Sequence, residues 1–439
     1  MRIPPVYTGS DLNIAMREAC VPILPGPCTK MWTYDGMFPG PTIRRPSGVT
    51  TRVTFSNELP SSVGSTTVHH HGNHSASRFD GQPAEHLIAP GQKDTYTYDF
   101  MEDGQPERAA FQWYHDHRMD VTGRNVWMGL AGMFVLDDKF DAKLGLPKGA
   151  YDVPLMVVDR TFDQNNQLNY KFNSIGDLGN QILVNGVPSP YFEVADRKYR
   201  FRILNASNFR EYRFQLSEDM EMIQIATESG LLPQPLRRKS IVLGPAERAE
   251  VIIDFKGQLG RNITLSNTLD PIIDETPATV PREVMQFRVN RRNGKDNSRV
   301  PSELRPVPTT FGEPSETRVW VLGGSPGLGA TRRKDEGNPP RNILWLINGQ
   351  PFDHTRVDAQ PKLNSTERWI FVNNTITLHR VHIHDVDWKI VSRSGTGVAV
   401  ATPGDPDAAL SEAGLRETFL VQSGETVEVI SRFTDHLGK

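Results

Sequence analysis

The chain has 439 residues, and 49 Lys and Arg against 52 Asp and Glu leave a net charge of −3. It lacks the basic excess that a nucleic-acid backbone attracts, so we expect no nucleic-acid partner. No apolar run approaches the roughly 20 residues of a membrane span, so we expect no membrane partner either. At roughly 150 residues per domain, the length predicts about three domains. The 36 Gly and 33 Pro are typical of many short strands joined by turns.

The two cysteines and the first residues leave alternatives open. Cys20 and Cys28 flank a Pro-rich turn and can pair if its two limbs fold back on each other, so a disulfide and two thiols are both possible. The start, MRIPPVYTGSD, shows no signal peptide, and the compartment and the oligomeric state stay open.

Polar and apolar residues alternate at several points of the chain, which indicates half-buried strands. The segments with this period are Leu12 to Met16, Val53 to Phe55, Phe201 to Ile203, Val251 to Ile253 and Val427 to Val429.

One phrase occurs three times: an Asp-Gly or Asn-Gly turn, then a strand that ends in Asn. The repeat predicts an all-β protein of three similar Greek-key sandwich or barrel domains. We place these domains at residues 1–150, 151–311 and 312–439, with the first boundary after the helix-like segment DDKFDAKLGL. The copies are Asp35-Gly36 with Asn57, Asn185-Gly186 with Asn205, and Asn348-Gly349 with Asn373.

Nine of the twelve histidines fall in three short strings. Residues i and i+2 of a strand project from one face about 6.5 to 7 Å apart, so each His-x-His pair offers two imidazoles to one side. One such pair is often structural, but three facing one cavity predict a site for several metal ions, and imidazoles suit Cu, Zn, Ni or Fe. The strings contain His69, His70, His71 and His74; His115 and His117; and His379, His382 and His384.

A zinc hydrolase is an alternative, because the first string approximates the His-x-His-x-Asp-His motif of the metallo-β-lactamase type. Asn73 stands where that motif has its Asp ligand, and Asn replaces it poorly. That fold also alternates its strands with long amphipathic helices, which the sequence does not predict.

Phrases along almost the whole chain resemble the multicopper oxidases, most of all the branch of spore-coat laccase, bilirubin oxidase and phenoxazinone synthase. They are TTVHHHGNH, FPGPTI, WYHDHRMDVTGRNVWMGLAGMFVL, ILVNGVPSPYFEV, RKYRFRILNASN, GPAERAEVIIDF and HRVHIH.

The resemblance implies three cupredoxin domains, with a type 1 copper in the third. It also implies a cluster of one type 2 and two type 3 coppers between the first and third. Such an enzyme takes single electrons from a phenol-, aminophenol- or bilirubin-like substrate and reduces dioxygen to water. The alternative within this resemblance is a copper-binding structural or coat protein without catalytic activity.

Carried over by residue, His69 and His382 resemble the type 2 ligands, and His379 resembles a type 1 ligand. Asp80 stands where the family has an acid that helps deliver protons, although an Asp-Gly turn would also explain it. His70 and His74 are expected to point away from the metals, and His86, His354 and His436 have no counterpart. This chain also has residues that resemble four of the six type 3 ligands: His71, His115, His117 and His384.

The family's last motif, His-Cys-His, does not occur in this sequence. A type 1 site needs that thiolate, so the activity of the 439-residue chain alone is in doubt. The third domain is therefore expected to be incomplete. Three explanations stay open: a shortened form of a longer protein, which we favour; a strand supplied by a second chain; or a redox-inactive relative.

Overall fold

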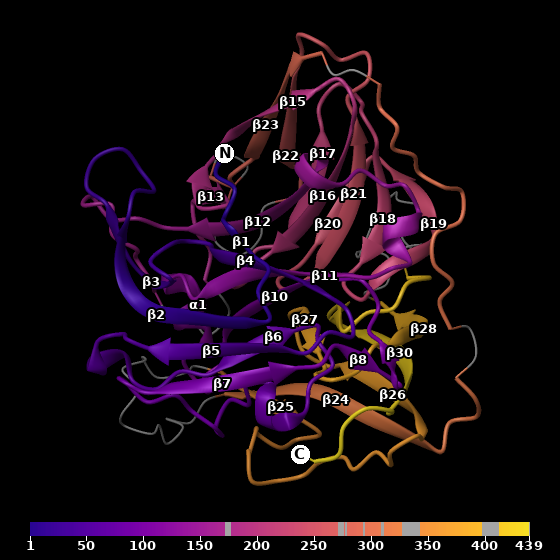
Figure 1. Cartoon of the computed structure of the whole chain (residues 1–439). Helices are drawn as coiled ribbons and strands as arrows, with labels where there is room; N and C mark the ends of the chain where they lie inside the picture. The colour runs from indigo at the N-terminus through magenta and orange to yellow at the C-terminus, as the bar shows by residue number, and fades with distance from the viewer. Residues whose placement is uncertain are drawn as a thin grey trace.

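The computed structural model describes residues 1–171, 177–270, 276, 279–292, 295–308, 311–326, 343–396 and 412–438. Nearly all regular structure in this part of the chain is β-strand. Its one α-helix, α1 (Thr122–Met128), has seven residues, and no described helix is long and apolar enough to cross a membrane. In Figure 1, strands from the middle of the chain lie at the top, and those of the first and last thirds adjoin below.

The strands of the first third form two sheets that enclose a common core, to which Met16, Phe55 and Phe134 contribute side chains at most 1% exposed. One sheet holds, in spatial order, β1 (Val6–Tyr7), β4 (Gly40–Pro46), β11 (Ala131–Asp137), β10 (Ala110–Asp116) and β6 (Val68–His71). The other holds β3 (Thr29–Tyr34), β2 (Asp11–Val21), β5 (Thr51–Asn57) and β7 (Lys93–Tyr98). A separate pair consists of β8 (Met101–Glu102) and β9 (Gln105–Pro106).

The middle third repeats this arrangement around Phe201, Val251 and Phe287, which are fully buried. Its larger sheet holds β14 (Val187–Pro188), β13 (Gln181–Val184), β12 (Asp152–Arg160), β16 (Lys198–Asn205), β21 (Arg248–Asp254), β18 (Met222–Thr227) and β19 (Gly230–Arg238). Its smaller sheet holds β15 (Tyr191–Ala195), β23 (Glu283–Arg291), β22 (Asn262–Asn267), β17 (Tyr212–Leu216) and β20 (Ser240–Leu243).

The last third packs around Trp388, Phe419 and Val427. Its main sheet holds β25 (Ile343–Ile347), β24 (Glu316–Pro326), β26 (Thr366–Asn373), β30 (Glu425–Arg432) and β28 (Lys389–Gly395). Opposite it lies a pair of strands, β27 (His379–His382) and β29 (Thr418–Val421).

The three Asx-Gly phrases form the same turn. Both residues of each phrase have positive φ, namely 54° and 77°, 49° and 73°, and 51° and 74° along the chain. This pair of left-handed conformations defines the type I′ hairpin turn, which Asn-Gly and Asp-Gly favour. The Asx side chains accept hydrogen bonds at 2.7 to 2.8 Å from the backbone N–H groups of Ala15, Met156 and Val321.

The three Asn residues of the repeat also make matching contacts. The side-chain amides of Asn57, Asn205 and Asn373 each donate to a backbone carbonyl, at 2.9 to 3.0 Å. In each third, the strand that ends in this Asn pairs in parallel with an earlier strand. We therefore propose the division into three cupredoxin domains at 1–150, 151–311 and 312–439.

The helix-like interpretation of DDKFDAKLGL is wrong. The segment contains a three-residue 3₁₀ turn, η3 (Asp141–Lys143). The Asp138 carboxylate accepts the backbone N–H of Asp141 at 2.7 Å, and Gly145 takes a φ of 78°. A left-handed residue so soon after the first turn stops helix growth.

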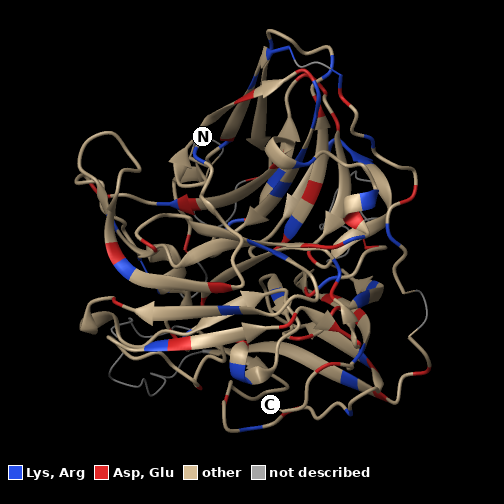
Figure 2. Ribbon diagram, viewed as in Figure 1, with Lys and Arg blue, Asp and Glu red and all other residues tan. Residues whose placement is uncertain are grey.

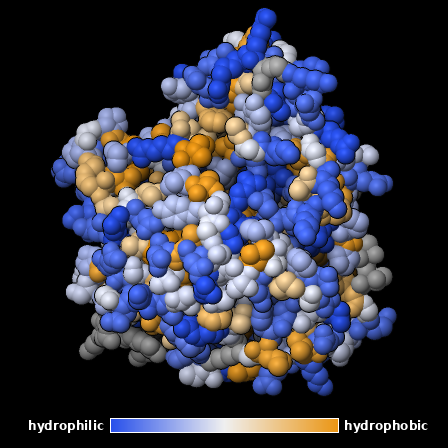
Figure 3. Space-filling model, viewed as in Figure 1, coloured by the Kyte–Doolittle hydropathy of each residue, from blue (hydrophilic) through white to orange (hydrophobic). Residues whose placement is uncertain are grey.

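An ion-pair network joins the first and middle thirds. Arg202, which is 1% exposed, donates to Asp152 and Glu250 at 2.7 Å, and Arg44 of β4 reaches Asp152 at 3.0 Å. Figure 2 shows basic and acidic residues side by side on strands of this region. The outer surface in Figure 3 is mostly hydrophilic, with hydrophobic residues in small scattered groups.

Candidate metal centre

The first two His-x-His pairs lie at the same end of two paired strands. β6 and β10 are antiparallel, and their register sets His69 opposite His115 and His71 opposite Trp113. Because residues two apart share a face, the rings of His69, His71 and His115 meet with centroids 5.3 to 5.7 Å apart. His117 lies just past β10, with its ring 5.2 Å from that of His69.

His70, between the two, points to the other face of the sheet as predicted. Its ring packs against Phe134 at 4.0 Å and against Tyr98 at 5.0 Å, within the core of the first third. Burial lowers the pKa of His70 to about 3, so the side chain is neutral there.

The third pair comes from the other end of the chain and closes the cavity. His382 ends β27, and its Nε2 lies 3.2 Å from Nε2 of His69. The ring of His382 stacks on His71 with centroids 3.7 Å apart, and His384 stacks on His69 at 3.9 Å. His384 also lies 5.1 Å from His117. The structure thus brings all six histidines of the three pairs into one cluster, and His69, His382 and His384 line a small pocket there, which we call the histidine cavity.

Hydrogen bonds decide which ring nitrogen each histidine turns to the cavity. The Nδ1 atoms of His69 and His382 lie 2.7 and 3.0 Å from the backbone carbonyls of Asp80 and Glu417. Nδ1 of His384 lies 2.6 Å from the Asp80 carboxylate. An imidazole that donates from one nitrogen offers the lone pair of the other, so these three rings present Nε2.

His71 is oriented the opposite way. Its Nε2 lies 3.0 Å from the Thr418 hydroxyl and 3.2 Å from the Glu417 carboxylate, whereas its Nδ1 lies 3.5 Å from His115. His71 therefore presents Nδ1 to the cavity. Burial lowers the pKa of His115 to about 3 and holds those of His71, His117 and His382 well below the ordinary value. Neutral imidazole is the form that binds a metal ion.

Asp80 bridges the two sides of the cavity. It is 2% exposed, and its carboxylate lies 2.6 Å from Nδ1 of His384 and 3.2 Å from Nδ1 of His69. Although burial opposes the shift, the charges of His384 and His69 lower the pKa of Asp80 below its ordinary value. Asp80 also precedes Gly81, which has a φ of 69°, so it lies in a turn and also faces the histidines. Its part in proton delivery stays a prediction.

Sequence comparisons identify the family. Multicopper oxidase models match residues 16–141 and 328–438. A laccase from Bacillus stratosphericus is 34% identical over 97% of this chain and 90% of its own length. The bilirubin oxidase of Albifimbria verrucaria is also 34% identical, over 92% of this chain and 68% of its own length. This chain belongs to the multicopper oxidase family.

Comparison with solved structures gives the same family. The crystal structure of a multicopper oxidase variant from Aquifex aeolicus is 27% identical, with a TM-score of 0.82 over 99% of this chain and 92% of its own. One from Pediococcus acidilactici is 28% identical, with the same TM-score over 100% and 86%. The predicted all-β cupredoxin architecture and the predicted family are therefore confirmed, and copper is the cofactor of this oxidoreductase.

The histidine cavity fits copper. Two nitrogens that each bind one ion at about 2 Å lie at most about 4 Å apart, and the Nε2 atoms of His69 and His382 meet that limit at 3.2 Å. His71 joins this pair in a group whose ligand atoms all lie within 4.8 Å of one another. An all-imidazole donor set suits copper.

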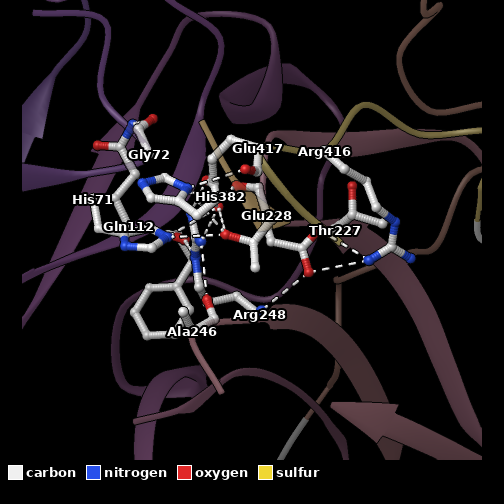
Figure 4. A network of polar contacts seen from close by, with 12 residues as sticks. His71, Gly72, Gln112, Thr227, Glu228, Ala246, Arg248, His382, Arg416 and Glu417 are labelled. Atoms are coloured by element: carbon white, nitrogen blue, oxygen red, sulfur yellow. Dashed lines mark hydrogen bonds and ion pairs between the residues drawn. The ribbon is translucent and has the colours of Figure 1, made fainter. Parts of the chain in front are cut away.

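Sequence reasoning missed a polar network behind this multicopper oxidase cavity (Figure 4). Glu417, just before β29, accepts two hydrogen bonds from Arg248 of β21, at 2.5 and 2.6 Å, and also contacts His71. Although burial opposes the shift, Arg248 lowers the pKa of Glu417. Arg416 in turn donates to Glu228 at 3.1 Å. The sequence around these residues does not predict the network, because the two partners of each pair are more than 160 positions apart.

His379 lies outside the cavity of the six histidines. Its Nε2 contacts the Thr375 hydroxyl at 2.8 Å, and its ring meets Trp345 at 4.9 Å. His379 and Trp345 both line a cavity of about 410 Å³.

Cys20 and Cys28 form a disulfide with Cα atoms 5.4 Å apart, which decides between the disulfide and the two thiols. The residues of this sequence therefore do not fit a type 1 centre, because no thiolate joins His379, and we derive no step through it.

The remaining histidines are not part of the cluster of six, although His74 lines the same small pocket as His69, His382 and His384. Nδ1 of His74 lies 2.7 Å from Asp435, and Nδ1 of His436 lies 2.9 Å from Asp385. His86 is exposed, and its φ is 53°.

Proposed function

We propose that His69 and His382 hold the type 2 copper of this oxidase, and that the type 3 pair is held by His71, His115, His117 and His384. The observation that carries the proposal is the contact at 3.2 Å between His69 and His382, which are 313 positions apart and lie on separate sheets. When bound there, copper supplies the reduction of dioxygen to water with single electrons taken from the reducing substrate.

The chain's own residues prepare this site. The backbone carbonyls of Asp80 and Glu417 and the Asp80 carboxylate fix which nitrogens of His69, His382 and His384 face inward. We further propose that Asp80 acts as the acid–base group of the cluster, because its carboxylate lies in the same hydrogen-bonded network and is buried away from bulk water. His379 keeps the role that the resemblance predicts, one histidine of a type 1 site, but this sequence supplies no thiolate to complete that site.

The reducing substrate is proposed to be a phenol, an aminophenol or a bilirubin-like tetrapyrrole. The similarity to a laccase and to a bilirubin oxidase over most of the chain supports this class. The partners of the reaction are then dioxygen and this small reducing molecule.

The test is copper content, measured before activity. We expect the purified 439-residue chain to retain copper, and His69→Ala and His382→Ala to lose most of it. His86→Ala, which changes an exposed histidine outside the cavity, should keep it. Because both cysteines form a disulfide, we expect no intense copper–thiolate absorption near ~600 nm. Equal copper in all four proteins would contradict the ligand assignment.

Dioxygen uptake then separates the substrate classes. A phenol, an aminophenol and bilirubin are compared as electron donors, with ascorbate as a general reductant. Uptake driven by ascorbate but by none of the three would overturn the substrate class and leave the ligand assignment untouched.

A further inference from the structure

A second group of potential metal ligands adjoins the histidine cavity, and two of its members, His74 and Asp387, also line that cavity. His74, Glu102 and Asp387 each offer a ligand atom, and these atoms all lie within 4.8 Å of one another. The three come from the turn after β6, from β8, and from the segment between β27 and β28. The fold thus brings together residues as far apart as 313 positions in the sequence.

His74 is held in the orientation of a metal ligand. Its side chain is 6% exposed, and its Nδ1 lies 2.7 Å from the Asp435 carboxylate. A histidine bound to a metal commonly donates its second N–H to a carboxylate, which fixes the ring and its tautomer. The other nitrogen, Nε2, is buried, has no hydrogen-bond partner among the described residues, and lies 4.0 Å from Asp387.

The surroundings favour a positive charge. Although burial opposes the shift, the hydrogen bond to Asp435 and the charges of Glu102 and Asp387 raise the pKa of His74 well above its ordinary value, so a metal ion would replace the proton of this ring. Burial raises the pKa of Asp387 to about 7 against the lowering effect of His74, and the charge of Glu102 adds to the rise. Arg432 lines the same cavity, but its guanidinium pairs with Asp103 at 3.2 Å. The cavity, of about 400 Å³, is lined by all three residues of the group and leaves room for an ion with water ligands.

We propose that His74, Glu102 and Asp387 form a site for one divalent transition-metal ion, which adjoins the six histidines and shares no ligand with them. Asp435 is the positioning residue that orients His74. One imidazole with two carboxylates is a donor set that Zn²⁺, Mn²⁺ and Co²⁺ accept, whereas Mg²⁺ and Ca²⁺ prefer oxygen ligands alone.

The experiment uses the copper-loaded 439-residue chain, dialysed against Zn²⁺, with zinc and copper counted in the same sample. We expect one zinc per chain with no loss of copper, and a rise in the unfolding temperature because the ion binds the folded form. His74→Gln should lose this zinc, while Asp435→Asn should weaken its binding about 10- to 100-fold.

Two variants serve as controls. Asp103→Asn changes an acid that lines the same cavity outside the group, and His382→Ala changes the histidine cavity; both should still bind the zinc. If His74→Gln does not fold, Asp387→Asn takes its place with nearly the same shape. Zinc bound equally by wild type and His74→Gln, zinc lost with His382→Ala, or Mg²⁺ bound as tightly as Zn²⁺ would each overturn the proposal.

Discussion

The two sides of the histidine cavity are held in different ways. His69, His71 and His115 lie on two paired strands of a five-stranded sheet and are 1 to 5% exposed. His382 and His384 lie at the end of β27 and beyond it, with side chains 17% and 24% exposed. Main-chain pairing positions the first side, which holds His69, His71 and His115. The second side, which holds His382 and His384, is positioned by side-chain contacts with the first side and with the middle third.

This difference explains where the buried charges lie. Asp80 reaches from the first third to His384, and Arg248 reaches from the middle third to Glu417, next to β29. A side formed by two strands alone lacks the ladder of hydrogen bonds that a wider sheet supplies. Charged contacts across the thirds therefore complete the site, and substitutions at the two sides should have separable effects.

A large loss of stability is expected at Gly81, which supports the first side. A Cβ at this position would overlap the backbone of Val68 and His69, and the φ of 69° disfavours any other residue. Gly81→Ala should lower the free energy of unfolding by about 2 to 5 kcal/mol, from strain and overpacking together. Gly91→Ala is the matched control, because Gly91 also has positive φ but nothing within 4 Å, so only about 1 to 2 kcal/mol should be lost. Equal losses in denaturant titrations would contradict the packing argument.

A loss of similar size is expected at the Arg248–Glu417 ion pair, the clamp that holds the second side. Arg248→Met leaves the buried Glu417 carboxylate without its cation, which should cost about 3 to 5 kcal/mol of unfolding free energy. Arg261→Met removes an exposed pair with Glu218, whose side chains are more than half exposed, and should cost at most about 1 kcal/mol. If both variants lose the same stability, the clamp does not hold the second side.

Asp80→Asn tests the bridge between the two sides. The amide keeps the shape but has one acceptor oxygen in place of two, so copper affinity should fall about 10- to 100-fold while the fold persists. Competition with a copper chelator measures this affinity. Asp94→Asn is the control. Asp94 pairs with Arg78, at 2.8 Å, and not with one of the six histidines. An unchanged affinity for Asp80→Asn would remove Asp80 from the site.

The smallest effect is expected at Thr418. Its hydroxyl lies 3.0 Å from Nε2 of His71 and 3.2 Å from Nδ1 of His382, so it contacts both sides. Thr418→Val keeps the volume and should weaken copper binding less than tenfold, in line with about 1 kcal/mol for one hydrogen bond. Thr54→Val removes a hydroxyl contact with Thr95 on the far sheet and should leave copper binding unchanged. A loss in Thr54→Val as large as in Thr418→Val would show that the effect is not local.

Local patterns in the sequence were sufficient for much of the fold. The three Asx-Gly turns and the alternating strands depend on the conformations of neighbouring residues, and those preferences act within a few positions. The same holds for the histidine pairs, because the two-residue period of a strand places His69 and His71 on one face and His70 on the other. The helix predicted in DDKFDAKLGL failed because the left-handed Gly145 ends it after its first turn.

The rest was decided by contacts between distant segments. Nothing near Glu417 indicates that Arg248 binds it, and nothing near His74 indicates Asp435, which is 361 positions away. Such pairs form only when the folded sheets exclude water and leave buried charges that need partners, so their energy depends on the tertiary structure rather than on local sequence. The amino-acid sequence by itself determined which residue types and turns were present. Only the tertiary structure decided which nitrogen of His71 and of His384 faces the cavity, because that choice follows from contacts between the first and last thirds, with Thr418 and with Asp80.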